Sequence, residues 1–195
     1  MSLSSQAGHR SKLVVISGPS GAGKTSICRK LAEDPQIDLS ISATTRPMRK
    51  GEVDGVDYYF LTKEEFDARI RAGEFLEWAE YNRNFYGTLR SEVQRKLETG
   101  HWVVLEIEVQ GTRRLREAEV GAIYIFIMPP SLAELEHRLR ARKTESEEVI
   151  RRRIEIAKSE MHMSHLYDHV VINKDLNQAV EEVRQKIGIN AGGPS

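Results

Sequence analysis

The residues with the clearest chemical potential form a glycine-rich segment from Gly18 to Thr25 that reads GPSGAGKT. The segment matches G-x-x-x-x-G-K-[S/T] at every fixed position. Its glycines let the backbone curl so that successive N–H groups face phosphate oxygens, and a following helix adds partial positive charge. We predict that these residues hold a nucleoside triphosphate, with Lys24 on the outer phosphates and Thr25 on magnesium: Gly18, Pro19, Ser20, Gly21, Ala22, Gly23, Lys24 and Thr25.

A second group of anion-binding residues follows in the turn-rich segment 42–58, SATTRPMRKGEVDGVDY. Arg46 and Arg49 stand three residues apart, and Tyr58 opens an expected strand. Arginine presents a planar fork of donors to phosphate oxygens, which lysine does not. In isolation the stretch would be better explained as a solvated charge cluster on a loop. Its position in the chain favours a second phosphate site, because further polar residues follow: Glu77, Tyr86, Gly87, Thr88, Glu106 and Glu108.

The elements that position these residues alternate between strand and helix. Short β-branched or apolar runs, each followed by a helix-forming stretch, predict a parallel sheet covered on both faces. The expected strand and helix pairs are 12–17 with 24–33, 102–107 with 110–117, 122–128 with 132–142, and 169–172 with 176–187. The stretch 42–100 breaks this alternation and is expected to form an insertion with its own small sheet, from strands 57–61, 75–81 and 85–88 and helices 63–72 and 91–98.

Capping boxes mark three expected helix starts, because a hydroxyl residue is followed three places later by a carboxylate. The three pairs are Thr62 with Glu65, Ser131 with Glu134, and Thr144 with Glu147.

Bulk composition indicates one ordinary soluble domain. The chain has 195 residues, of which 39% are hydrophobic and 30% charged, and its 29 basic side chains equal its 29 acidic ones. There is no overall basic field to attract nucleic acid or an anionic membrane. The single Cys28 fits a reducing cytoplasm, and the longest apolar run, 123–130, is too short to span a bilayer. We expect flexible tails at 1–10 and 189–195, no nucleic acid or membrane partner and no obligate protein partner.

A guanine-nucleotide switch is the main competing use of a phosphate loop. Asn173, Lys174 and Asp175 approximate the N-K-x-D sequence that reads guanine in GTPases, but the aspartate stands one place too early. No D-x-x-G element follows the second strand either. A GTPase is therefore disfavoured.

The motifs taken together resemble guanylate kinase. GPSGAGKT, SATTRPMRKGEVDGVDYYF, GEFLEWAEYNRNFYGT, LEIEVQG, IFIMPPS, RKTESEE and YDHVVIN stand in the family's order and spacing over residues 13–187. The resemblance implies a nucleoside monophosphate kinase that transfers the γ-phosphoryl group of ATP to GMP, and to dGMP, with Mg²⁺, in purine nucleotide metabolism. It also implies an α/β fold at 11–188: a phosphate-loop core with a parallel sheet flanked by helices, a small mixed GMP-binding insertion at about 42–100 and a helical lid at about 138–153.

The resemblance also implies residue roles. Arg46, Arg49, Tyr58 and Tyr86 bind the GMP phosphate next to Gly87, while Ser42, Glu77, Thr88 and Glu108 read the guanine. Arg142 and Arg153 close over the ATP phosphates with Arg138, and Asn173 touches the adenine. Lys24, Arg46, Arg142 and Arg153 are the implied catalytic residues, and Glu106 reaches magnesium through water.

Three positions depart from the family's usual residues. Thr88 stands where serine is expected, Glu106 where aspartate is frequent, and Lys143 where glycine is frequent. These substitutions concern the base site, the metal site and the hinge of the lid respectively.

Two other functions stay open on sequence alone. One is a non-catalytic guanylate-kinase-like module that binds protein partners; such modules can dispense with Lys24, Thr25, Arg46 and Arg49, all present here. The other is a phosphate-loop kinase for a different nucleotide or a small alcohol. The presence of Glu77 and Ser42 disfavours this second function.

Overall fold

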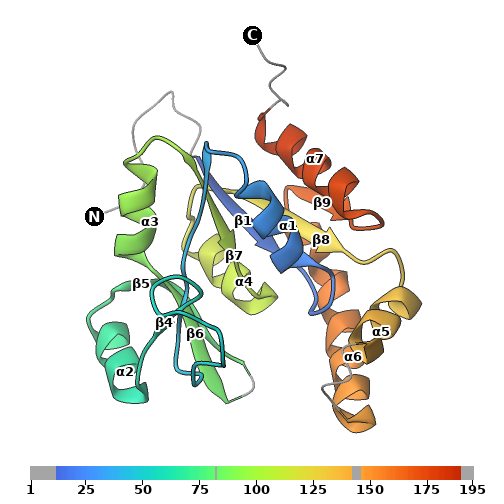
Figure 1. Cartoon of the computed structure of the whole chain (residues 1–195), viewed down its shortest axis with the longest axis horizontal. Helices are drawn as coiled ribbons and strands as arrows, with labels where there is room; N and C mark the ends of the chain where they lie inside the picture. Colours follow the sequence, from blue (N-terminus) through green and yellow to red (C-terminus); the bar gives the residue numbers. More distant parts are fainter. Residues whose placement is uncertain (1–11, 82, 142–145, 190–195) are drawn as a thin grey trace.

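The computed structural model describes residues 12–81, 83–141 and 146–189. Its core is a five-stranded parallel sheet of order β2-β7-β1-β8-β9 (Figure 1). The predicted parallel sheet flanked by helices is therefore confirmed. The strands are β1 Leu13–Ser17, β2 Ile37–Leu39, β7 Trp102–Glu106, β8 Ile123–Met128 and β9 His169–Ile172.

The central strand β1 is buried on both faces, as an all-apolar run between helical layers must be. Alternate side chains of β1 enter opposite layers, because a strand has a period of two. Val14 and Ile16 pack with α1 (Lys24–Leu31) and α7 (Leu176–Ile187), whereas Leu13 and Val15 pack with α3 (Arg90–Leu97) and α4 (Val109–Glu117). Two hydrophobic layers thus fix the sheet, and with it the segments that leave its carboxyl edge.

The insertion forms a second, mixed sheet of order β4-β3-β6-β5. Its strands are β3 Ala43–Thr44, β4 Tyr59–Phe60, β5 Phe75–Tyr81 and β6 Asn84–Leu89. Helix α2 (Lys63–Arg71) covers this sheet, and the rings of Phe66 and Phe75 stack with centroids 4.3 Å apart. The insertion therefore has a hydrophobic core of its own.

Helices α5 (Leu132–Ala141) and α6 (Glu147–Met161) pair through a separate apolar cluster that contains Leu135 and Ile150. A short 3₁₀ helix, η1 (His162–Leu166), leads from α6 to β9. Figure 1 shows the insertion and the α5–α6 pair on opposite sides of the core.

Helix starts largely follow the capping signals. Thr62 and Glu65 form the predicted reciprocal box, and the hydroxyl of Ser131 accepts from the Glu134 N–H at 3.1 Å. Thr144 lies outside the described residues; α6 begins at Glu147 with Ser146 as its N-cap. Within the described ranges, no helix combines the length and apolar character needed to cross a membrane.

Candidate active site

The phosphate loop joins β1 to α1 in a conformation that requires glycine. Gly18 and Gly23 have φ angles of 141° and 95°. A Cβ on Gly18 would lie 2.3 Å from the Ile127 carbonyl oxygen, and one on Gly23 would lie 2.2 Å from Asn173 Nδ2. Both a left-handed backbone and close approach of neighbouring groups therefore select glycine here.

Lys24 opens α1 and points back across the loop. Its side chain is 7% exposed, and its ammonium donates to the carbonyl oxygens of Gly18 at 2.7 Å and Pro19 at 3.3 Å. The Glu108 carboxylate lies 4.0 Å away. These contacts hold the positive charge within the curl of the loop, where phosphate oxygens would meet it.

Thr25 and Glu106 form an oxygen pair at the end of β7. The Thr25 hydroxyl donates to Glu106 Oε1 at 2.6 Å. Burial raises the pKa of Glu106, although the Thr25 hydrogen bond and the charge of Lys24 oppose that effect. Hard oxygen donors beside a phosphate loop suit Mg²⁺, which takes one or two protein ligands and completes its shell with substrate phosphates and water. The described residues contain no cluster of three or more His, Cys, Asp or Glu able to hold a metal.

Arg153 of the expected lid and Asn173, which follows the last strand, both contact the phosphate loop. Arg153 Nη2 donates to Ser20 Oγ at 2.7 Å. Arg138 donates to the Asn173 carbonyl oxygen at 3.1 Å, and the buried Asn173 amide donates to the Ala22 carbonyl oxygen at 2.8 Å. The Asn173 side chain therefore supports the conformation of the phosphate loop. Arg142 and Lys143 lie outside the described residues.

A cavity of about 480 Å³ adjoins the loop and collects most of the other expected residues. The core contributes Thr25, Glu106 and Glu108 to its wall. The insertion contributes two arginines, three tyrosines and the expected base readers Ser42 and Glu77, but not Thr88: Ser42, Arg46, Arg49, Tyr58, Glu77, Tyr81, Tyr86 and Gly87. Segments more than 60 residues apart in sequence thus line one space.

Arg46 is held in the cavity wall by Glu52, to which sequence analysis gave no role. The guanidinium donates to the two carboxylate oxygens of Glu52 at 2.7 and 3.0 Å, in a fork-to-fork pair. Glu52 also accepts from the Arg49 N–H at 2.7 Å, and Arg46 Cζ lies 5.3 Å from the centre of the Tyr58 ring. Glu52 lies six residues after Arg46 in a turn-rich segment. In such a segment no helix or strand period applies, so the pairing could not be predicted from the sequence.

Glu77 is the most deeply buried acid of the cavity wall. Its side chain is 7% exposed, and the Thr88 hydroxyl donates to its Oε1 at 2.8 Å. Burial raises the pKa of Glu77 to about 7, against the lowering effect of the Thr88 hydrogen bond. Thr88 is itself only 1% exposed, so in this structure its hydroxyl orients Glu77.

Gly111 makes room for Glu77 in the first turn of α4, another role that sequence analysis missed. A Cβ on Gly111 would lie 2.4 Å from Glu77 Oε2 and 2.6 Å from Ile107 Cγ2. The carboxylate therefore lies against a helix N-terminus, whose partial positive charge favours the ionised form. Glycine inside a helix lowers the stability of the helix, so its presence there can indicate that another group packs closely against the helix backbone. At Gly111 that group is the Glu77 carboxylate.

The near-match to a guanine-reading GTPase sequence has a structural explanation. Asp175 is the N-cap of α7, and its Oδ1 accepts from the Gln178 N–H at 3.0 Å. Its carboxylate is therefore engaged in capping a helix, and Asn173 is engaged with the phosphate loop.

The phosphate loop, the oxygen pair and the adjoining arginine-lined cavity define a P-loop phosphotransferase. Comparison with known proteins gives the family: the family model described as "Guanylate kinase" matches residues 10–188. The chain therefore belongs to the guanylate kinase family, as its motifs indicated.

Individual relatives agree with the family assignment. Guanylate kinase of Halalkalibacterium halodurans is 49% identical, over 88% of this chain and 85% of the relative, and that of Symbiobacterium thermophilum is 50% identical, over 88% and 82%. The crystal structure of guanylate kinase from Anaplasma phagocytophilum superposes with a TM-score of 0.74 at 34% identity, covering 90% of this chain and 84% of that one.

Proposed function

We propose that this protein transfers the γ-phosphoryl group of ATP to GMP, and to dGMP, giving ADP and GDP. The observation that carries the proposal is the buried Glu77 carboxylate in a cavity that adjoins the phosphate loop and is also lined by Arg46, Arg49, Tyr58 and Tyr86. A triphosphate site and an acceptor site thus share one wall, formed by Thr25, Glu106 and Glu108.

The Glu77 carboxylate favours the binding of guanine over the binding of adenine. Guanine presents N–H donors at N1 and N2, and an ionised carboxylate offers two oxygens that can accept from both. Adenine has an unprotonated N1, so it would leave one oxygen of the buried carboxylate without a donor. Unpaired buried polar groups carry a large free-energy penalty, and hydrogen-bonding sites therefore reject such analogues strongly. Ser42 and Glu108 line the same cavity and complete the proposed base site.

The cationic residues counter the repulsion between two phosphorylated substrates. We assign Arg46 and Arg49, with Tyr58 and Tyr86, to the GMP phosphate, and Lys24 to the outer phosphates of ATP. Phosphoryl transfer requires positioning and neutralisation of spreading negative charge more than covalent chemistry. Mg²⁺ held by Thr25 and, through water, by Glu106 would supply further neutralisation of the phosphates. No protein general base is needed in this scheme.

The segment at about 138–153, between the end of α5 and the middle of α6, is the proposed lid. We assign Arg138, Arg142 and Arg153 to the ATP phosphates and Asn173 to the adenine. Arg153 already reaches Ser20 of the phosphate loop. Lid closure would exclude water and so prevent hydrolysis of ATP. We further propose a cytoplasmic enzyme with ATP and GMP as its small-molecule partners and no obligate protein partner.

A parallel assay tests this function. ATP, Mg²⁺ and one of GMP, dGMP, AMP, CMP or UMP are supplied, and ADP formation is followed. Turnover is expected with GMP and dGMP only. Folded protein that binds ATP but does not turn over GMP would favour the protein-binding module, and equal turnover of AMP would contradict the proposed role of Glu77.

Gly111→Ala should raise the KM for GMP about tenfold with little change in the KM for ATP, because the methyl group displaces the Glu77 carboxylate. Steady-state kinetics with each substrate varied in turn measure both constants. Gly121→Ala is the matched control, since a Cβ there meets nothing within 4 Å. An unchanged KM for GMP in Gly111→Ala would show that the carboxylate position does not matter for binding.

The KM for GMP should depend on pH through Glu77, whose pKa is raised to about 7. A protonated carboxyl keeps a hydrogen on one oxygen and so loses an acceptor for guanine. GMP binding therefore requires loss of this proton, and the KM should rise as pH falls from 8 to 6. Glu77→Gln supplies the control, because any pH dependence that survives in it comes from the GMP phosphate or from other groups. Identical slopes in the two proteins would contradict the prediction.

A further inference from the structure

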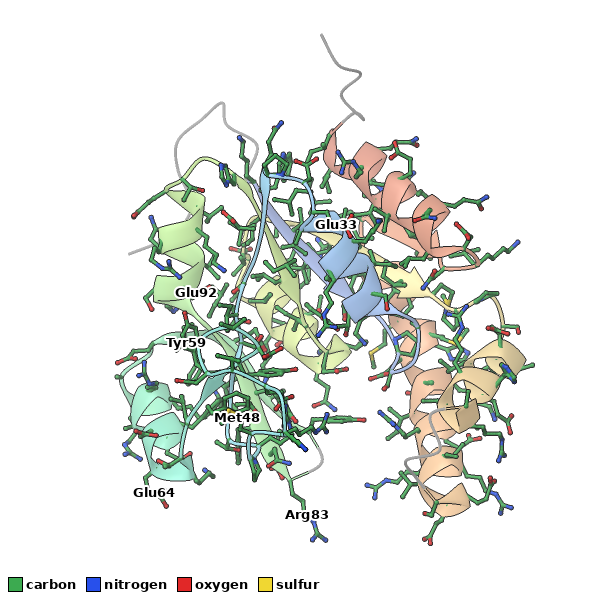
Figure 2. The ribbon with its side chains drawn as sticks, viewed as in Figure 1. Glu33, Met48, Tyr59, Glu64, Arg83 and Glu92 are labelled. Carbon is green, nitrogen blue, oxygen red and sulfur yellow. The ribbon has the colours of Figure 1, made fainter. Side chains whose placement is uncertain are left out.

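Glu92, outside the proposed active-site cavity, is a buried carboxylate to which sequence analysis gave no role. It lies in the first turn of α3 and is 3% exposed. Four groups donate to it: the Ile41 N–H at 3.2 Å, the Tyr59 hydroxyl at 3.0 Å, the Lys96 ammonium at 2.7 Å and the Arg95 guanidinium. Figure 2 shows Glu92 and Tyr59 close together where α3 meets the insertion.

The donors to Glu92 come from segments that carry proposed GMP contacts. Ile41 directly precedes Ser42, and Tyr59 directly follows Tyr58. Ser42 and Tyr58 both line the cavity. Helix α3, in contrast, is anchored in the core, because Val93 packs in the hydrophobic layer that contains β1 and β7. One side chain thus ties the core to two segments of the acceptor site, the loop that precedes β3 and the start of β4.

The charge of Glu92 is well supported where it lies. Burial opposes ionisation, but hydrogen bonds from Lys96, Arg95 and the Ile41 N–H outweigh it and hold the pKa of Glu92 below its usual value. Lys96 also donates to the Leu39 carbonyl oxygen, which extends the same junction toward β2. A carboxylate has about four acceptor positions, so four donors saturate it.

Glutamine cannot replace this arrangement. It has nearly the same shape, but its amide presents only one acceptor oxygen and adds an N–H₂ group facing Lys96, Arg95 or Tyr59. At least one buried donor would lose its partner, and the two cations would lose their counter-charge. The least costly relief is a shift of the segments that contain Ile41 and Tyr59, since α3 is fixed by its apolar packing.

We propose that Glu92 is a positioning residue for the acceptor nucleotide, which sets the placement of Ser42 and Tyr58 through Ile41 and Tyr59. The inference rests on the proposed GMP site. It adds a determinant of acceptor binding that lies outside the cavity and touches no substrate. The phosphate loop shares none of these contacts, so binding of ATP should not depend on Glu92.

The test compares Glu92→Gln with wild type in steady-state kinetics and thermal unfolding. We expect the KM for GMP to rise about tenfold while the KM for ATP stays within about twofold, because misplacement of binding groups acts only on the acceptor. Glu98→Gln is the matched control: Glu98 is exposed at the end of the same helix, where it accepts from the Gln94 side chain. Its kinetic constants should equal those of wild type.

Tyr59→Phe removes a single donor to Glu92 and keeps the aromatic ring. It therefore provides a second test of the proposal if Glu92→Gln does not fold. It should raise the KM for GMP in the same direction, about threefold. A lower unfolding temperature with an unchanged KM for GMP in both variants would overturn the proposal by showing a merely structural role. Wild type that fails to phosphorylate GMP would instead refute the proposed function, so the two failures are distinguishable.

Discussion

Replacing Lys24 with methionine should lower the turnover number about a thousandfold, which is the effect of removing one strong electrostatic stabiliser of a transition state. Lys24 is 7% exposed and lies within the phosphate loop, so its charge acts in a partly dry environment where it is weakly screened. Methionine fills similar space, and folding should survive. The KM for GMP should change by less than about threefold, because Lys24 serves the phosphate donor.

Lys30→Met is the control for this experiment. Lys30 lies on the same helix, is exposed and pairs with Glu33 at 2.8 Å. Turnover numbers from initial rates at saturating ATP and GMP, together with thermal unfolding, separate chemistry from stability. A Lys24 variant that keeps turnover within about threefold of wild type would mean that the loop lysine does not stabilise the transferred phosphoryl group.

Three cations that we assign to substrate phosphates each donate a hydrogen bond to an oxygen atom of the protein itself. Lys24 donates to loop carbonyl oxygens, Arg153 to the Ser20 hydroxyl, and Arg46 to Glu52. Each buried or half-buried cation therefore has an oxygen partner from the protein itself. Binding of a phosphate exchanges one set of oxygens for another, which keeps the cost of desolvating these side chains low.

Most of the core could be predicted from sequence because its strands are continuous apolar runs. Such runs bury most side chains of β1, β7 and β8, whereas the edge strand β9 leaves Val170 and Ile172 exposed. All four strands lie within one residue of their expected bounds. Strands β2 and β3 were not predicted. They have three and two residues, too few for a periodic pattern, and pairing with β7 and with β4 and β6 defines them.

Some residues of the site could be predicted from a local motif, whereas the roles of others depend on tertiary contacts. The phosphate loop is contiguous, so its motif was sufficient. The role of Glu77 could be assigned only through resemblance to a family, since its burial depends on α4 approaching β5 at Gly111. Glu92 could not be found at all, because its donors at Ile41 and Tyr59 lie 51 and 33 residues away.

Replacing Glu77 with glutamine should have opposite effects on activity and on stability. The amide offers guanine one acceptor and one donor in place of two acceptors, so kcat/KM for GMP should fall about a thousandfold. Retained kcat/KM for GMP would show that another group reads the base. Glu80→Gln, at an exposed position of the same strand, is the matched control and should behave as wild type.

The stability effect follows from the pKa of about 7, against an ordinary value of 4.5. The folded protein keeps the Glu77 proton up to about pH 7, whereas the unfolded chain loses it near pH 4.5. Raising the pH through this window therefore weakens the folded wild type, by about 3 kcal/mol above pH 7. Glutamine has no proton to lose, so Glu77→Gln should be more stable than wild type at pH 8. The difference should shrink to about 1 kcal/mol at pH 5 and vanish only below pH 4.5.

Urea unfolding at pH 5, 6.5 and 8 measures this difference directly. A pH-independent gap between the two proteins would mean that Glu77 is not destabilised by burial. A gap that opens with pH, together with lost GMP turnover, would show that the fold tolerates a desolvated carboxylate because guanine supplies the donors that it lacks. Saturating GMP should then narrow the gap at pH 8, since the ligand stabilises only the protein that binds it.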